Sequence, residues 1–120
     1  MSTTGFCFPP QSRLKTPAAY KNVFAHPVKA SDKYFTLLAI RNSLDKPRLG
    51  LAIAKKNIKR AVDRNKIKRI ARESFRLQQQ TLIALDIVVL AKKEAAIVDS
   101  KLLRNSLEKL FLQLVNRCDS

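Results

Sequence analysis

Apolar residues recur with two different periods along this 120-residue chain, and the changes of period divide it into predicted elements. Residues 28–31 and 34–41 lie on either side of the polar pair Asp32-Lys33 and predict a β-hairpin, whose second strand is rich in aromatic and aliphatic residues. Residues 48–54 predict a third strand, in which Gly50 indicates a close approach of another group to the backbone. Residues 85–92 are almost continuously apolar and predict a fourth, central strand.

Three segments carry helical signals. Thr16 followed by a proline predicts the start of a short helix over 18–24. A second helix is predicted over 60–78, and a third begins after a cap at Asp99 or Ser100 and reaches about residue 116. The third helix has an apolar stripe that is expected to lie on the sheet, made of Leu102, Leu103, Leu107, Leu110, Phe111, Leu114 and Val115.

The order of these elements predicts the fold class. Strands with helices between and after them favour an α+β protein, a two-layer α/β sandwich built on a four-stranded sheet. Residues 1–120 are expected to form a single domain, with residues 1–12 irregular and flexible. The chain shows no internal repeat, no low-complexity tract and no linker.

Positive charge is the unusual feature of the composition. The chain has 24 Lys and Arg against 9 Asp and Glu, a net charge of +15. Residues 55–76 alone hold ten basic and two acidic side chains, a net +8 and more than half of the total. Self-repulsion in such a patch favours a polyanionic partner. Nucleic acid is the leading candidate, and an anionic membrane surface is the alternative.

The basic side chains of the predicted helix at 60–78 are ordered along it. At about 100° per residue, the predicted buried face consists of Ile67, Ile70, Ala71, Ser74 and Leu77. The side predicted to lie opposite carries Arg64, Lys68, Arg72 and Arg76 at a spacing of four, with Asn65 and Arg69 beside them. Glu73 is placed on the flank near Lys66, so this row keeps one sign over about 18 Å. Its length matches several phosphates along a strand, and the alternative is a generic cationic surface that favours solubility.

A second basic cluster precedes that helix, at Lys55, Lys56, Lys59 and Arg60. It is expected at the N-terminal end of the helix, where the free amide groups also favour phosphate.

The cysteines and the apolar runs predict a location. Cys7 and Cys118 are isolated and form neither a disulfide framework nor a metal motif, which favours a reducing compartment. No apolar segment of signal-peptide type begins the chain, and the run at 81–91 is too short to cross a bilayer and contains Asp86. A cytoplasmic protein without a membrane contact is therefore expected.

The inventory of acids and histidines argues against catalysis by the protein alone. His26 is the one histidine and is interpreted as a loop residue, so no histidine pair supplies an acid and a base. The carboxylates are scattered singly and include no cluster for two magnesium ions.

The basic helix resembles the signature helix of a known family, the bacterial ribonuclease P protein component. The matching residues are Ala61-Val62-Asp63-Arg64-Asn65-Lys66-Ile67-Lys68-Arg69, Arg72-Glu73 and Phe75-Arg76. Further matches in family order are Arg13-Leu14-Lys15, Tyr20, Val23-Phe24, Arg48-Leu49-Gly50-Leu51, Lys55-Lys56 and Asp86-Ile87-Val88-Val89. Two positions depart from the family pattern. Lys66 replaces an arginine and loses its bidentate fork, and Lys59-Arg60 stand where Gly-Asn is common.

The resemblance implies a function and completes the expected fold. In this family a large RNA is the catalyst, and the complex removes the 5′ leader from precursor tRNA by endonucleolytic cleavage. The implied partners are that RNA and the leader, with no obligate protein partner. The protein itself is expected to bind no cofactor. The RNA uses Mg²⁺, and the protein is expected to lower the concentration of Mg²⁺ that the RNA requires. The implied sheet is mixed, with a left-handed β-α-β crossover, a fold also found in the second domain of a ribosomal protein.

The resemblance also implies two sets of site residues. The set expected to bind the catalytic RNA is Lys55, Lys56, Lys59, Arg60, Arg64, Asn65, Lys66, Lys68, Arg69, Arg72 and Arg76. The set expected in a cleft for the leader is Arg13, Lys15, Tyr20 and Phe24.

Two aromatic residues of the predicted cleft are one helical turn apart. Tyr20 and Phe24 therefore share a face, and stacking on unpaired bases would suit leaders of any sequence. The alternative is that both rings only anchor the first helix to the sheet. The hydroxyl group of Tyr20 predicts that this ring is less deeply buried than that of Phe24. Tyr34, Phe35 and Phe75 are expected in the core.

Two other functions stay open from the sequence alone. One is a ribosomal or other structural RNA-binding protein of similar fold, which would co-purify with ribosomal particles and not with one RNA of several hundred nucleotides. The other is a free-standing nuclease, against which the inventory of acids argues.

Overall fold

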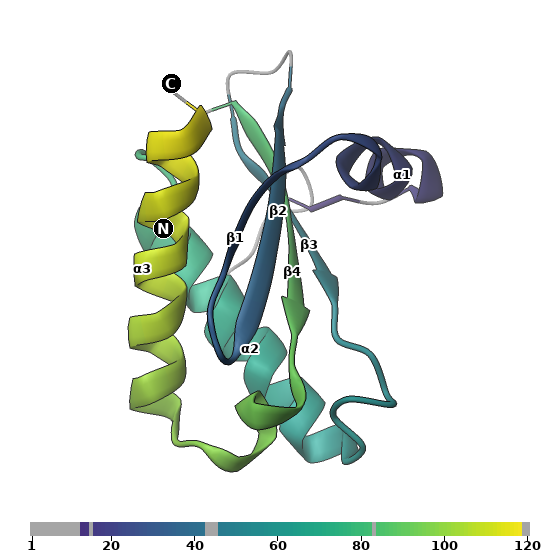
Figure 1. Cartoon of the computed structure of the whole chain (residues 1–120), viewed down its shortest axis with the longest axis vertical. Coiled ribbons are helices and arrows are strands. Elements are labelled where there is room, and N and C mark those ends of the chain that lie inside the picture. The colour runs from purple at the N-terminus through teal and green to yellow at the C-terminus, as the bar shows by residue number, and fades with distance from the viewer. Residues whose placement is uncertain (1–12, 15, 43–45, 83, 119–120) are drawn as a thin grey trace, which may run out of the picture.

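A computed structural model gives the architecture and describes residues 13–14, 16–42, 46–82 and 84–118 (Figure 1). Its elements are, in chain order, α1 (Pro17–Ala25), β1 (Val28–Ser31), β2 (Phe35–Arg41), β3 (Arg48–Ala52), α2 (Ala61–Gln78), β4 (Leu85–Ala91), the 3₁₀ helix η3 (Lys93–Ile97) and α3 (Ser100–Cys118). All predicted helices and strands are present within two residues of their expected ends, and η3 was not predicted. The expectation for residues 1–12 lies outside the described residues.

The four strands form one mixed sheet in the order β1-β2-β4-β3. β2 is antiparallel to both β1 and β4, whereas β3 and β4 are parallel, with Gly50 opposite Val88. The central position predicted for β4 is confirmed, because it lies between β2 and β3. Its side chains are buried on both faces, which explains its unbroken apolar run.

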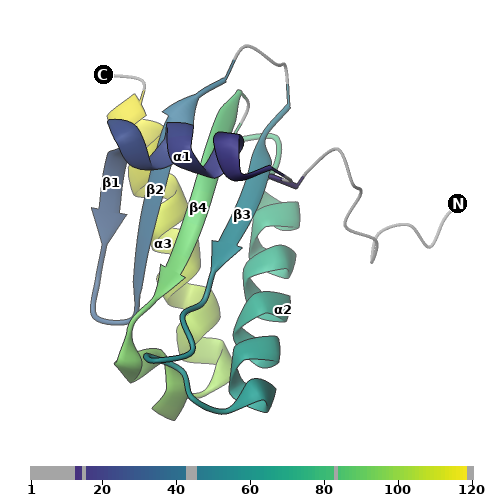
Figure 2. The ribbon, with the colours of Figure 1, turned by 90° about the vertical axis from the view of Figure 1, so that its right-hand side faces the viewer.

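The two faces of the sheet are covered differently (Figure 2). α2 and α3 lie side by side on one face, over the larger core. That core includes Phe35, Leu37, Ile67, Ile70, Phe75, Ile87, Val89, Leu103, Leu107 and Phe111. α1 crosses the other face, where Val23 is fully buried against Leu38 and Val88. The predicted sandwich of a four-stranded mixed sheet and helices is confirmed, and α1 adds a partial layer to it.

The crossover from β3 through α2 to β4 is left-handed. Seen from the side of α1, both strands point downward, β4 lies to the left of β3, and α2 passes behind the sheet (Figure 2). About 98% of such crossovers have the opposite hand, so local sequence rules give no indication of this one.

Local hydrogen bonds explain where the elements start. Thr16 Oγ1 accepts from Ala19 N at 3.1 Å and caps α1, as predicted. Asp32 Oδ1 accepts from the backbone N–H groups of Tyr34 and Phe35 and closes the hairpin. Asp99 Oδ1 accepts from Leu102 N at 2.9 Å, which identifies Asp99 as the cap of α3.

The apolar stripe predicted for α3 is correct except at Leu102. This side chain is 39% exposed, whereas the neighbouring Leu103 is fully buried. One residue of helix rotates a side chain by about 100°, which is enough to turn Leu102 off the sheet.

One end of the sheet is held by a partly buried ion pair. Asp86 on β4 is 3% exposed, and its Oδ1 accepts from Arg48 Nε and from Asn42 Nδ2, both at 2.8 Å. Its Oδ2 accepts from Arg48 Nη2 at 2.6 Å, so the guanidinium group is bound by two parallel hydrogen bonds. The hydrogen bond from Arg48 to Asp86, and then the charge of that carboxylate, raise the pKa of Arg48 above its ordinary value, while burial opposes the shift. The pair ties β3 to β4 across their parallel register.

Among the described residues, no helix is both long and apolar enough to span a membrane.

Candidate nucleic-acid interface

The basic helix α2 packs on the sheet through one narrow face. Its buried residues are Ile67, Ile70, Ala71, Ser74 and Phe75. The prediction of Leu77 on this face is wrong, since that side chain is 74% exposed. Phe75 takes the place at the core and meets Phe111 of α3 edge to face, with ring centroids 6.4 Å apart.

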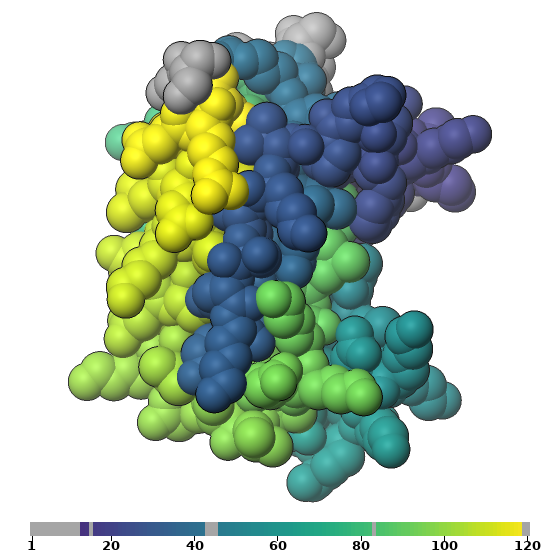
Figure 3. Space-filling model, in the orientation of Figure 1, coloured from purple at the N-terminus to yellow at the C-terminus, as the bar shows by residue number. Residues whose placement is uncertain are grey.

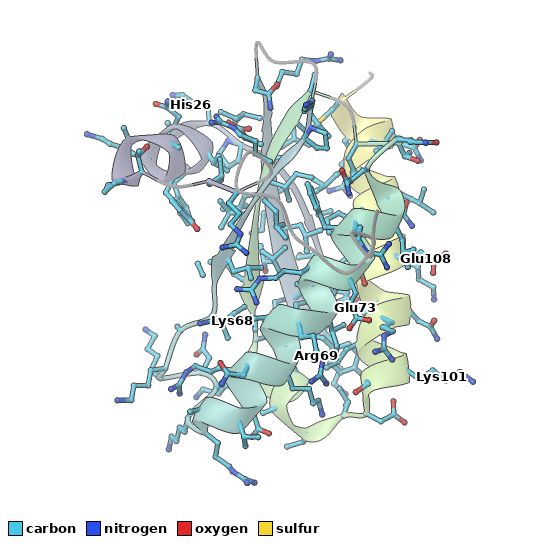
Figure 4. The ribbon with its side chains drawn as sticks, turned by 180° about the vertical axis from the view of Figure 1, so that it is seen from behind. His26, Lys68, Arg69, Glu73, Lys101 and Glu108 are labelled. Atoms are coloured by element: carbon cyan, nitrogen blue, oxygen red, sulfur yellow. The ribbon has the colours of Figure 1, made fainter. Side chains whose placement is uncertain are left out.

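The basic row of α2 lies beside the buried face and not opposite to it, which corrects the prediction. The row consists of the half-buried Arg64, Lys68, Arg72 and Arg76, whereas Asn65 and Arg69 are exposed. Lys68 directly follows the buried Ile67, and Arg72 directly follows the buried Ala71, so each lies only about 100° from the core. Lys68 projects from the side of α2 that faces away from α3 (Figure 4). The row therefore points toward the edge of β3.

The opposite flank of α2 faces α3 and carries the acid. Glu73 Oε1 lies 3.9 Å from Arg69 Nε and 3.7 Å from Arg104 Nη2 of α3. To the flank position predicted for Glu73, the structure adds contacts with Arg69, labelled beside it in Figure 4, and with Arg104. Glu73 therefore lies at the seam between the two helices, and the other acid of α2, Asp63, lies in its first turn. The part of the flank beside β3 that Lys68 and Arg72 form keeps a single sign.

A hollow at the edge of β3 brings the two predicted sets of site residues together. It has a volume of about 170 Å³ and is lined by Arg13, Leu14, Tyr20, Leu49, Leu51, Lys68 and Arg72. Arg13 and Tyr20 belong to the set predicted for the leader, whereas Lys68 and Arg72 belong to the set predicted for the catalytic RNA. The hollow, called the edge cleft below, therefore presents one aromatic ring and three cations from three separate segments.

Gly50 explains how the ring reaches the edge cleft. A β-carbon at this position would lie 2.7 Å from Tyr20 Cε1 and 2.9 Å from Leu14 Cδ1, closer than side chains tolerate. The close approach predicted from Gly50 is confirmed, and the approaching group is Tyr20. Its hydroxyl oxygen accepts a hydrogen bond from Leu51 N at 3.2 Å, so the hydroxyl end of the ring is held against β3.

The relative burial predicted for the two aromatic residues of α1 is wrong. Tyr20 is half-buried, and Phe24 is 45% exposed. The hydroxyl group of Tyr20 did not keep the ring near solvent, because the N–H of Leu51 satisfies it. Phe24 does not line the edge cleft, and its ring faces solvent from the next turn of α1. Lys15, also predicted for this site, lies outside the described residues.

Arg64 has a structural contact that its place in the basic row did not indicate. Its Nη1 donates to the backbone oxygens of Ile58 at 2.9 Å and Lys59 at 2.8 Å. Arg60 caps α2 without a side-chain hydrogen bond, so Arg64 closes the turn that leads into the helix. The sequence has no Ser, Thr, Asp or Asn at the N-cap position of α2, and this absence could have indicated that another side chain closes the turn.

The second basic cluster lies at the N-terminal end of α2. Lys55, Lys56, Lys59 and Arg60 are all exposed, and Lys66 on α2 is half-buried. Lys93 of η3 lies beside this cluster, a neighbour that sequence analysis missed. The parallel pairing of β3 and β4 was the missing information, because the segments that follow two parallel strands emerge at the same end of a sheet.

The remaining candidate groups are far from these surfaces or are dispersed. His26 ends α1 as an exposed residue, which agrees with its interpretation as a loop residue (Figure 4). Across the part of the chain that is described, no three His, Cys, Asp or Glu side chains lie close enough together to bind a metal ion. That the protein itself binds no cofactor stays a prediction.

Comparison with known proteins agrees with this architecture. Residues 8–115 match the family model described as "Ribonuclease P". Two curated relatives are named "Ribonuclease P protein component". The protein from Methylococcus capsulatus is 48% identical over 95% of this chain and 89% of its own length, and the Salmonella typhimurium protein is 51% identical over 87% of each.

Solved structures give the same result. The ribonuclease P protein from Staphylococcus aureus superimposes with a TM-score of 0.79 at 31% identity, over 85% of this chain and 94% of its own. The protein from Thermotoga maritima, in complex with 1-(4-fluorophenyl)-2-thiourea, has a TM-score of 0.76 at 32% identity, over 82% and 96%. The chain therefore belongs to the ribonuclease P protein family, whose members are the protein components of an endoribonuclease that processes tRNA.

Proposed function

We propose that this protein binds the RNA component of ribonuclease P through the basic surface of α2 and holds the 5′ leader of precursor tRNA in and beside the edge cleft. The observation that carries the proposal is the convergence of Tyr20, Arg13, Lys68 and Arg72 on one hollow. An aromatic ring among cations is the chemistry that binds a single strand without reading its sequence.

Each group in the edge cleft has a role in this proposal. Lys68 and Arg72 project from a rigid helix and neutralise phosphates of the catalytic RNA at the wall of the edge cleft, where that RNA meets the leader. Tyr20 presents the side of a ring whose position is fixed by Leu51 N and by the absence of a side chain at Gly50. Phe24, exposed one turn further along α1, offers the next stacking surface.

The chemistry of cleavage is assigned to the RNA. The protein's contribution is to reduce the repulsion between RNA phosphates, which otherwise requires a high concentration of Mg²⁺, an ion held by the RNA. The protein then assists endonucleolytic removal of the leader in the cytoplasm, with no obligate protein partner and no membrane contact.

Reconstitution tests the function directly. The purified protein alone is expected to leave precursor tRNA uncut, and adding it to the ribonuclease P RNA of Salmonella typhimurium is expected to restore cleavage at an Mg²⁺ concentration at which the RNA alone is inactive. The measurement is the rate of appearance of the free leader and of mature tRNA.

The controls separate the alternatives. An equal amount of a protein of similar charge without this fold measures non-specific charge neutralisation. Cleavage by rigorously RNA-free protein would contradict the assignment of the chemistry to the RNA. Failure to stimulate any bacterial ribonuclease P RNA, together with recovery on ribosomal particles, would favour the structural RNA-binding function instead.

Phe24→Ala is expected to weaken the binding of precursor tRNA to the reconstituted complex about fivefold, while the binding of mature tRNA stays unchanged. The exposed ring loses one stacking contact, at the lower end of the roughly 1–3 kcal/mol range for a base on an aromatic side chain. Because the ring is 45% exposed, its removal leaves the core intact. Equilibrium binding of the two tRNAs measures the difference.

Tyr20→Ala is the contrasting variant. It removes a half-buried ring and its bond to Leu51 N, so a lower melting temperature is expected in addition to weaker binding of precursor tRNA. Equal losses for precursor and mature tRNA in the Phe24 variant would place the leader elsewhere on the protein.

A further inference from the structure

A second hollow lies at the other end of the sheet from α1. It has a volume of about 480 Å³ and is lined by Lys56, Asn57, Lys59, Arg60, Asp63, Lys93 and Ala96. The turn before α2 supplies one wall and η3 supplies the other. In Figure 3 the two segments lie side by side at the lower end of the molecule, teal and green respectively. This hollow is called the basal pocket below.

The walls of the basal pocket are anchored in the core. Ile58 in the turn and Ala95 in η3 are both fully buried. Asn57 Nδ2 donates to Ala91 O at 3.2 Å and so ties the turn to the end of β4. Arg64 closes the same turn through its bonds to the carbonyl groups of Ile58 and Lys59. The rim is therefore held in place before any ligand arrives.

The charges around the basal pocket are not balanced by the protein. Four cations line it, Lys56, Lys59, Arg60 and Lys93, against the one carboxylate of Asp63. Within the described residues, no carboxylate lies at ion-pair distance from any of the four. Four like charges converging on a fixed concave surface repel one another and favour a bound anion.

We infer that the basal pocket binds backbone phosphate of the RNA partner, with Lys93 as a contact residue that belongs to no recognised motif of the chain. This inference rests on the proposed function, since the polyanion is the ribonuclease P RNA. Lys56, Lys59 and Arg60 already belong to the set expected to bind that RNA, and the inference adds Lys93 of η3 and a pocket that joins these cations at a place separate from the edge cleft. Arg60 and Arg72 are twelve residues apart, so the two contacts are separated by about 18 Å along α2. The RNA then has to follow the helix from one site to the other.

Lys93→Ala is expected to weaken binding of the ribonuclease P RNA of Salmonella typhimurium about four- to sixfold at 0.15 M salt. The loss of one phosphate contact lowers the slope of log affinity against log salt concentration by about 0.7–0.9. Between 1 M and 0.15 M salt, a change of slope of this size corresponds to the loss of affinity of about four- to sixfold. Lys93→Arg keeps the charge and is expected to restore both the affinity and the slope. The matched control is Lys109→Ala, which removes the same charge from an exposed position of α3. The measurement is a titration of the RNA with each protein at several salt concentrations.

The outcomes separate this inference from the proposed function. If the unaltered protein does not bind the RNA, both are overturned. If the unaltered protein binds it and Lys68→Ala weakens binding, but Lys93→Ala behaves like Lys109→Ala, the proposed function stands and the basal pocket is not an RNA site. A loss in Lys93→Ala with a normal melting temperature, restored by Lys93→Arg, supports the inference.

Discussion

Replacing Lys68 and Arg72 together by alanine is expected to weaken the binding of ribonuclease P RNA about 25-fold at 0.15 M salt, while the protein stays folded. Both side chains line the edge cleft, and neither is in an ion pair within the described residues. Each contact with a phosphate is worth about fivefold at that salt concentration, because the electrostatic contribution grows as salt is diluted from 1 M. Removing two like charges from one flank of a helix also relieves a small repulsion, so stability is expected to be equal or slightly higher.

The salt dependence provides the decisive measurement for this variant. The slope of log affinity against log salt is expected to fall by about 1.4–1.8, since two phosphate contacts are lost. Lys101→Ala with Lys109→Ala is the matched control, because both positions are exposed on α3. An unchanged slope in the Lys68 and Arg72 variant would place the RNA on another face of the protein.

Arg64 is kept out of this variant because its guanidinium group is bound to the carbonyl oxygens of Ile58 and Lys59. Removing it would disturb the turn that carries Lys59 and Arg60, and a loss of affinity could not be assigned to one lost phosphate contact. Arg64 is therefore a positioning residue in addition to any contact that it makes with RNA.

Asp86→Ala is expected to lower the free energy of unfolding by about 2–3 kcal/mol. The change leaves Arg48 and Asn42 without the carboxylate that accepts three of their hydrogen bonds. Breaking a buried pair by removing one partner costs about 3–5 kcal/mol. The expected value is lower, because the side chain of Arg48 is 29% exposed and water compensates part of the loss.

Urea or thermal denaturation of the purified protein measures this effect, and a fall in the melting temperature of roughly 10 °C is expected. Asp63→Ala, which removes a carboxylate without a hydrogen bond to an arginine in the described structure, is the control. A melting temperature equal to that of the Asp63 variant would show that the pair with Arg48 contributes nothing measurable to stability.

The elements of the fold were predictable because their signals are local. Thr16, Asp32 and Asp99 each form a hydrogen bond within three residues along the chain, so the sequence alone indicates where α1, the hairpin and α3 start. The failures arise where a contact is not local. Leu77 and Phe75 both lie within reach of the buried face of α2, and the partner that selects Phe75 is Phe111, 36 positions away.

In the candidate site, too, the local features were predictable and the tertiary contacts were not. The positions of the cations along α2 follow from helical spacing, and the need for space at Gly50 follows from glycine in a strand. That Tyr20 fills this space, that Arg64 closes a turn and that Lys93 joins the basal pocket all depend on tertiary contacts. For Tyr20 the general preference of its hydroxyl group for water gave the wrong answer, because the N–H of Leu51 replaced the water.

The hand of the β3-α2-β4 crossover decides where a nucleic-acid strand can lie. A mirror-image connection between the same two strands would carry α2 to the face that α1 covers, and the two helices would compete for one surface. With the observed hand, α1 and α2 lie on opposite faces and flank the margin of β3, where Tyr20 from one helix and Lys68 from the other meet. The location of the groove is thus a property of chain topology. Point substitutions can change its charge and its aromatic character, but moving it would require a different path of the chain.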